Sequence, residues 1–239
     1  MRINWNFIKG IILLGLVLFL YAFSSFKNNG RPVKNVNVQF TGLNNVFITT
    51  EMVNKLLILS QEKPYLLNKD DIDLRELEFS LESNNMIKSA QVYLTVNGVV
   101  MAKVEQRVPI ARVQNSEVFY IDDEGFRMPL STQHSARVPV VYGIVEEGDL
   151  QRIYKLALTA HNDLFLKTYL TGIYLNKNKE ISLKLRLLDF HILVGNIDNL
   201  ELKFKNLKAF YQKAKKDNML DIYKSVNLQF DNQVVCTKK

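Results

Sequence analysis

Residues 86–112 read MIKSAQVYLTVNGVVMAKVEQRVPIAR, and this stretch decides the fold of the first half of the chain. Apolar, often β-branched residues nearly alternate with polar ones on both sides of Asn97-Gly98. This pattern predicts a β-hairpin closed by a type I′ turn, in which both central residues take a positive φ. Pro109 is expected to end the second strand, because proline has no backbone N–H to donate to the ladder.

The residues before the hairpin predict one strand and two helices. Val33 to Phe40 alternates in polarity, and Thr49 or Thr50 can cap a helix whose apolar positions recur with helical spacing. Asp73 can cap a second helix, Leu74 to Ser83. The side chains expected to face inward on this helix are Leu74, Leu77, Phe79 and Leu81. Residues 33–112 therefore predict a small β-α-α-β-β domain, with two helices on one face of a three-stranded sheet.

The rest of the chain, residues 113–239, predicts a mixed β-rich domain with two or three helices. Its expected elements are a strand Glu117 to Ile121, a turn Asp122 to Gly125, a strand Arg137 to Gly143, a helix Leu150 to Lys167 capped by Asp149, strands Thr171 to Leu175, Ile181 to Leu187 and Phe190 to Val194, a helix capped by Asp198, and a terminal edge strand Ser225 to Val235. Leu200, Phe204, Leu207, Tyr211 and Ala214 form the apolar stripe of the last helix, with lysines on its other faces.

An apolar span precedes both domains. Residues 7–26 contain only one charge, Lys9, and their length of about 20 residues suits a transmembrane helix. The pattern favours an uncleaved signal anchor over a cleaved signal peptide, because bulky residues such as Phe23 and Phe26 crowd the small-x-small site around Ser24. Residues 1–6 are then a short cytoplasmic N-terminus, residues 27–32 a linker, and the two domains lie outside the cytoplasm.

Composition is that of a globular protein, with 47% hydrophobic and 23% charged residues. The single cysteine, Cys236, excludes an internal disulfide framework and any zinc site with several cysteines. Most of the net charge of +7 comes from residues 177–216, which contain ten Lys and Arg residues and four Asp and Glu residues. That stretch could contact anionic lipid, although a solvated helix face is the simpler interpretation.

Several motifs resemble those of the bacterial cell-division family FtsQ/DivIB, of the Bacteroidetes type. Residues 105–111, EQRVPIA, are similar to the family's E-R-x-P-x-A turn, and residues 120–125, YIDDEG, are similar to its (Y/L)-x-D-x-x-G strand and turn. Met128-Pro129-Leu130-Ser131 and Arg137-Val138-Pro139 add to the likeness. The β-α-α-β-β unit resembles a POTRA domain. The terminal stretch departs from the family's D-L-R-Y, because it reads Asn227-Leu228-Gln229-Phe230.

The resemblance implies a non-enzymatic scaffold in the inner membrane, with its domains in the periplasm. In the family, the last strand binds small single-pass coiled-coil proteins of the FtsB and FtsL type, and the scaffold helps to localise and regulate septal peptidoglycan synthesis with other division proteins. Strand addition at an unpaired sheet edge would supply such a contact. By position, the implied partner-binding residues are Ser225, Val226, Leu228, Phe230, Asn232 and Val234.

An enzyme is not expected from the residues themselves. His134, His161 and His191 lie at no metal-binding spacing, and the chain lacks a phosphate-binding loop, a dinucleotide fingerprint and a nucleophile-elbow motif. No cofactor, metal, nucleic acid or small-molecule substrate is therefore expected. The alternative function is that of a different anchored POTRA protein, which would bind extended clients during export or outer-membrane assembly.

Overall fold

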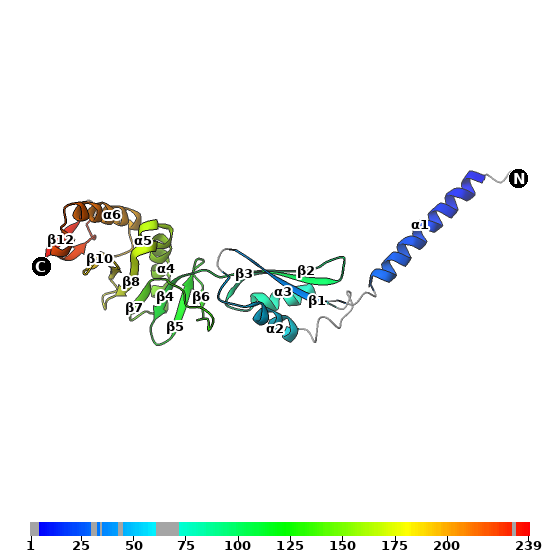
Figure 1. Ribbon diagram of the computed structural model, residues 1–239, viewed down its shortest axis with the longest axis horizontal. Coiled ribbons are helices and arrows are strands. Elements are labelled where there is room, and N and C mark those ends of the chain that lie inside the picture. Colours follow the sequence, from blue (N-terminus) through cyan, green and yellow to red (C-terminus); the bar gives the residue numbers. More distant parts are fainter. Residues whose placement is uncertain (1–4, 30–32, 34, 43–44, 61–71, 231–232) are drawn as a thin grey trace. The chain divides into compact units, whose positions relative to one another are not determined.

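A computed structural model of the protein describes residues 5–29, 33, 35–42, 45–60, 72–230 and 233–239. The chain divides into two compact units, Met1–Gln106 and Arg107–Lys239, and each is described by itself (Figure 1). The expected N-terminal tail, residues 1–6, and linker, residues 27–32, lie partly outside the described residues.

Helix α1, Trp5–Asn29, contains the apolar span that the sequence predicts. Its stretch Ile8–Lys27 is long and apolar enough to cross a membrane, and none of it is buried within the protein. Apolar side chains such as Leu14 and Phe19 are more than half exposed, at 64% and 66%. A helix of 25 residues extends about 37 Å, which is enough for a hydrocarbon core of about 30 Å.

Unit 1 is the predicted β-α-α-β-β domain. Strands β1 (Asn35–Thr41), β2 (Ile87–Leu94) and β3 (Val99–Gln106) form a sheet in the order β1-β3-β2, and helices α2 (Thr50–Ser60) and α3 (Leu74–Glu82) pack on it. Strand β3 pairs in parallel with β1 and antiparallel with β2. Its buried side chains Val100, Ala102 and Val104 lie at the centre of the core.

The hairpin between β2 and β3 is confirmed, but its turn differs from the expected type. Only Gly98 has a positive φ, of 83°, whereas Asn97 does not. Gly98 N–H donates to Thr95 O at 3.0 Å, and Thr95 N–H donates to Val99 O at 2.9 Å. This arrangement is a tight turn followed by a left-handed glycine, as in a three-residue hairpin loop, so the prediction of a type I′ turn was wrong.

Helix α3 begins as predicted but buries fewer side chains than expected. Asp73 Oδ1 accepts hydrogen bonds from the backbone N–H groups of Arg75, at 2.9 Å, and Glu76, at 3.1 Å. Leu77 and Leu81 are fully buried, whereas Phe79 is 74% exposed. The inward position for Phe79 was wrong, because it lies about 200° around the helix from Leu77.

The boundary between the units lies at Gln106 and Arg107, not at residue 112. Pro109 does not end the hairpin. Strand β3 already ends at Gln106, and Pro109 is the first residue of β4, Pro109–Gln114, which belongs to unit 2. The first position of a strand tolerates proline, because a backbone N–H is not needed there.

Unit 2 is a nine-stranded mixed sheet with helices on one face. Its strands are β4 (Pro109–Gln114), β5 (Val118–Asp122), β6 (Arg127–Met128), β7 (Val140–Gly143), β8 (Leu170–Leu175), β9 (Ile181–Leu185), β10 (His191–Gly195), β11 (Tyr223–Asn227) and β12 (Val235–Lys238). They lie in the order β12-β11-β10-β9-β8-β7-β4-β5-β6. Helices α4 (Glu147–Asn162), α5 (Leu164–Tyr169) and α6 (Leu200–Lys216) and the short 3₁₀ helix η3 (Leu220–Ile222) complete the unit.

The core of unit 2 lies between the sheet and its helices. One row of paired residues crosses the sheet through Val226, Ile192, Leu183, Ile173, Val141 and Val113, all fully buried. Against it pack Ile153 and Leu156 of α4, Leu166 of α5, and Leu200, Phe204, Leu207 and Tyr211 of the predicted stripe of α6. All five residues of that stripe are buried, which confirms the helical period.

Three helix ends in unit 2 differ from the sequence prediction. Helix α4 is capped at Glu146, and Asp149 lies inside its first turn, where its carboxylate accepts from Glu146 N–H at 3.0 Å. The expected single helix to Lys167 is two helices, because Asp163 is extended and its carboxylate caps α5 through Phe165 and Leu166. Helix α6 starts after Asn199, at φ 53°, and not after a capping Asp198.

Candidate functional site

The C-terminal stretch forms two strands, not the single strand 225–235 that the sequence predicts. Strand β11 ends at Asn227 and β12 begins at Val235. Strand β11 pairs in parallel with β10 and antiparallel with β12, so it is an inner strand. Strand β12 is the edge of the nine-stranded sheet (Figure 1).

The chain leaves β11 because of local hydrogen bonds. Gln229 N–H donates to the side-chain oxygen of Asn227 at 2.8 Å, which forms an Asx-type turn. Leu228 N–H still donates to Leu193 O at 2.8 Å, on β10. The polar pair Asp231-Asn232 between two β-prone runs could have indicated a hairpin in the sequence, but those two residues lie outside the described part of the chain.

The six residues implied as partner-binding therefore lie in different environments. Ser225 and Val226 are in β11, where Ser225 is opposite Thr237 and Val226 is opposite Cys236. Val226 and Leu228 are buried in the core, Phe230 is 46% exposed, and Val234 packs partly against the core. Asn232 lies outside the described residues.

The open side of β12 can be assigned from its hydrogen bonds. Lys239 N–H donates to Ile222 O at 2.8 Å, so this N–H points toward the β11 side. Peptide groups alternate in direction along a strand, so those of Lys238 and Cys236 point away from β11. In the part of the chain that the structure describes, no strand pairs with β12 on that side.

The side chains around this edge are mainly apolar or cationic. Val235 is 41% exposed, Lys238 is exposed, and Cys236 packs partly against the core. Burial raises the pKa of the Cys236 thiol, so it is less reactive as a nucleophile than an ordinary surface cysteine. The chemistry that the edge offers is therefore backbone hydrogen bonding, with side chains that can select a partner strand.

The two motifs that carry the family resemblance meet in unit 2. Arg107 Nη1 lies 2.7 Å from Asp122 Oδ2 and 3.2 Å from Glu124 Oε2. The other Asp122 oxygen accepts from the backbone N–H groups of Glu124, at 3.0 Å, and Phe126, at 2.7 Å. Because Asp122 is fully buried, this ion pair fixes the start of β4 to the turn after β5.

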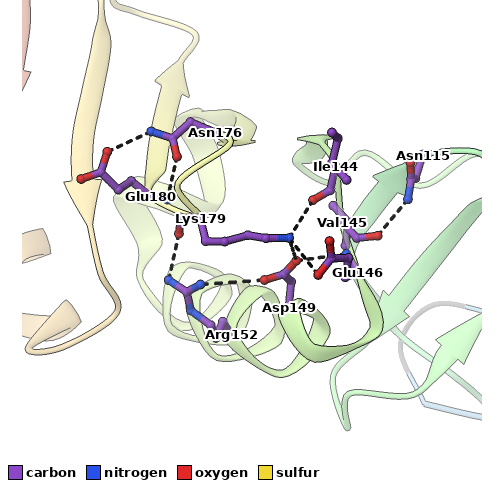
Figure 2. Close-up of polar contacts among 9 residues, drawn as sticks. All are labelled: Asn115, Ile144, Val145, Glu146, Asp149, Arg152, Asn176, Lys179 and Glu180. Atoms are coloured by element: carbon purple, nitrogen blue, oxygen red, sulfur yellow. Dashed lines mark hydrogen bonds and ion pairs between the residues drawn. The ribbon is translucent and has the colours of Figure 1, made fainter.

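A second polar cluster joins the β8–β9 turn to the start of α4. Figure 2 shows Lys179 reaching across to α4, where its Nζ lies 2.7 Å from Asp149 Oδ2 and 3.3 Å from Glu146 Oε2. Burial by itself would raise the pKa of the Asp149 carboxyl. The hydrogen bonds from Lys179 and from Glu146 N–H outweigh this effect, so the net pKa lies below its usual value of 3.8. Arg152 Nη2 adds a hydrogen bond to Lys179 O at 3.0 Å.

Several lysines of the basic stretch 177–216 contact other residues of unit 2 and are not simply solvated. Lys203 was expected on an outer face of α6, but it is 4% exposed, and its Nζ donates to Val194 O and Asn196 O at 3.0 Å each. Lys208 forms an ion pair with Asp163. Together with Lys179, these lysines connect elements of unit 2, so three of the ten cations in the stretch have a structural role.

A metal centre is not indicated for the described ranges, because no group of three or more His, Cys, Asp or Glu within them could hold an ion.

Comparison with known families places both units. Residues 33–105 match a POTRA-like domain. Residues 108–237, more than half of the chain, match the family described as FtsQ/DivIB, C-terminal related. No curated protein matched the chain. The two matches follow each other along the chain in the arrangement that the motifs and the fold indicate. The protein therefore belongs to the FtsQ/DivIB family of cell-division proteins, with a POTRA-like domain ahead of its C-terminal unit.

Proposed function

We propose that this protein is a non-enzymatic scaffold of the division complex that binds single-pass coiled-coil proteins of the FtsB and FtsL type. The partner adds a strand to the open side of β12. Through this contact the scaffold helps to localise and regulate septal peptidoglycan synthesis. Helix α1 anchors it in the inner membrane, with both units in the periplasm. Family membership supports a cell-division scaffold, and the apolar helix supports a single-pass membrane protein.

One observation carries the proposal, namely that β12 ends the nine-stranded sheet and has no neighbouring strand on its open side among the described residues. An extended peptide can bond to the outward peptide groups of Cys236 and Lys238. Five of the six residues implied by the resemblance are described by the structure, and they lie in β11 or in the connection between β11 and β12. Val226 and Leu228 hold β11 in the core, while Phe230 and Val234 lie in the connection that leads into the edge.

A proline scan along β12 tests the backbone contact. Lys238→Pro removes an N–H that points outward, and it leaves the bonds between β11 and β12 in place. We expect partner affinity to fall by about ten- to a hundredfold, because a partner carbonyl loses its donor at a desolvated site. The affinity is measured between the full chain in detergent micelles and purified FtsB/FtsL-type partners.

Two matched variants separate backbone from side-chain effects. Lys238→Ala removes the charge and keeps the N–H, so it should bind like the native chain within a few-fold. Thr237→Pro removes an N–H that points toward β11, so it should loosen β12 and weaken binding through the fold. Equal affinity of Lys238→Pro and Lys238→Ala would contradict strand addition at β12. Recovery of unfolded export clients in place of coiled-coil proteins would support the alternative function.

A further inference from the structure

Helix α3 carries a repeated apolar-acidic pair on adjacent faces. Leu77 and Leu81 are four residues apart and fully buried in the core of unit 1. Each is followed by a glutamate, so Glu78 and Glu82 form a second row beside the buried one. This arrangement places both glutamates at the border of the core, where Glu78 is partly buried and Glu82 is exposed.

That border is the edge of the sheet. Strand β2 is a terminal strand in the order β1-β3-β2, so its outer peptide groups lack a neighbouring strand among the described residues. Glu78 Oε1 accepts a hydrogen bond from Val92 N–H at 2.7 Å, and Glu82 Oε1 accepts one from Ala90 N–H at 3.1 Å. Both donors belong to peptide groups that point away from β3.

The two spacings match each other. Four residues of an α-helix rise about 6 Å, and two residues of an antiparallel strand rise about 6.8 Å. Glutamates at positions i and i+4 of α3 can therefore reach alternate N–H groups of β2 at the same time. A helix that presented neutral apolar side chains at these positions would leave the two edge donors without protein partners.

We propose that α3 is a built-in guard of this edge, whose Glu78 and Glu82 carboxylates occupy the donors that another strand would need. The guard closes β2 to strand addition, above all to the β2 strand of a second copy of this chain. Two copies of an unguarded β2 could pair antiparallel about a twofold axis, because the same edge would serve both chains. Strand addition to the POTRA-like domain at β2 is then excluded unless α3 moves.

A closed β2 edge fits a division scaffold better than a protein that binds extended export clients. A protein that captured extended export clients on β2 would have to break two charge-assisted hydrogen bonds for each client. A scaffold that binds its partners through the C-terminal unit loses nothing by closing this edge, and it gains protection from edge-to-edge aggregation. The guard does not depend on the β12 proposal, because it concerns only residues of unit 1.

The double variant Glu78→Ala/Glu82→Ala tests the guard in the full chain in detergent micelles. Alanine favours helix, so α3 should persist. We expect the Ala90 and Val92 amides to exchange with solvent about ten- to a hundredfold faster, because each loses a hydrogen bond to a charged group. We also expect a dimer that grows with protein concentration, measured by light scattering, with the Ala102 and Val104 amides of β3 still protected.

Glu78→Gln/Glu82→Gln is the matched control, because glutamine removes the charge and keeps the acceptor oxygen. It should remain a monomer with protected edge amides. Unchanged exchange at Ala90 and Val92 in the alanine variant would overturn the proposal, and so would faster exchange without any dimer at high concentration. If the β3 amides of the double variant also lose protection, the single variant Glu78→Ala replaces it. Exchange at the Val92 amide and dimer formation are then measured in the same way, and either result, if unchanged, overturns the proposal.

Discussion

The ion pair between Arg107 and Asp122 gives the sharpest stability prediction for unit 2. The Asp122 carboxylate is 0% exposed and the Arg107 side chain is 16% exposed, so neither charge is well hydrated. Arg107→Met keeps much of the aliphatic stem and removes the guanidinium. Asp122 then remains buried with two backbone N–H donors, from Glu124 and Phe126, and without its cation.

The expected loss can be worked from these contacts. Removing one partner of a buried pair typically costs about 3–5 kcal/mol. The two N–H groups stay in place and stabilise the carboxylate, so we expect a value near the lower end, about 3 kcal/mol. The Arg107 guanidinium also lies 4.8 Å from the centre of the Phe126 ring, and the loss of this contact adds about 0.5–1 kcal/mol.

Native-state hydrogen exchange measured by mass spectrometry can report this loss for unit 2 alone. Peptides from β4 and β5 should exchange at least about a hundredfold faster in Arg107→Met than in the native chain. The matched control is Arg127→Met, which breaks an ion pair with Glu147 whose side chains are 47% and 78% exposed. That control should change the free energy of unfolding by less than about 1 kcal/mol.

A double-mutant cycle decides whether the pair itself is responsible. Asp122→Asn removes the buried charge and keeps an oxygen that can accept from Glu124 and Phe126. The double variant Arg107→Met/Asp122→Asn should therefore lose at least about 1 kcal/mol less than the sum of the single variants. Additive losses, or a loss below about 1 kcal/mol in Arg107→Met, would refute the reasoning.

Three further predictions concern the folding of unit 2. Gly143→Ala should destabilise it by more than about 3 kcal/mol in urea unfolding, because Gly143 has a φ of 115° and an added Cβ would lie 2.2 Å from Leu175 O. Lys203→Met should cost about 1–3 kcal/mol in the same assay, because it leaves buried carbonyl groups without a donor, whereas Lys205→Met on the exposed face should cost little. The third prediction is acid sensitivity. The folded pKa of Asp149 lies below its usual 3.8, so its stabilising contribution is complete above that value and is lost as the pH falls through the folded pKa. Lys179→Met should reduce this loss, measured as unfolding free energy against pH between about 5 and 2.

Local chemistry predicted most elements of this fold. The Asn-Gly pair indicated the hairpin, Asp73 indicated the start of α3, and the apolar stripe from Leu200 to Ala214 indicated the buried face of α6. Each of these features depends on residues within a few positions of one another. Turn residues, caps and helical periods are set by short-range sterics and hydrogen bonds, so they can be recognised from one sequence.

Features that depend on how one element packs or pairs with another were not predicted. Lys203 was expected to be solvated, but the carbonyls that bind it belong to the end of β10 and the loop that follows. The terminal stretch was expected to be one edge strand, but the edge is defined by the pairing of β11 with β12, and alternation alone does not reveal a neighbour. Because the pairing makes β11 an inner strand, the candidate strand for partner binding is β12.

The motif at residues 105–111 shows how one short stretch serves two units. The Gln106 side chain accepts from Phe47 N–H at 3.0 Å and donates to Ile48 O at 2.9 Å, so it closes unit 1 ahead of α2. The next residue, Arg107, binds Asp122 and begins unit 2. Both side chains form hydrogen bonds to buried polar groups. Leaving such a group unpaired costs more free energy than an ordinary hydrogen bond contributes in net terms. Pro109 then starts β4 where no donor is needed. The motif therefore combines three separate requirements, namely a hydrogen-bonding side chain at Gln106 in unit 1, and a cation at Arg107 and a strand start at Pro109 in unit 2. From the sequence alone, these residues are interpreted as a single turn.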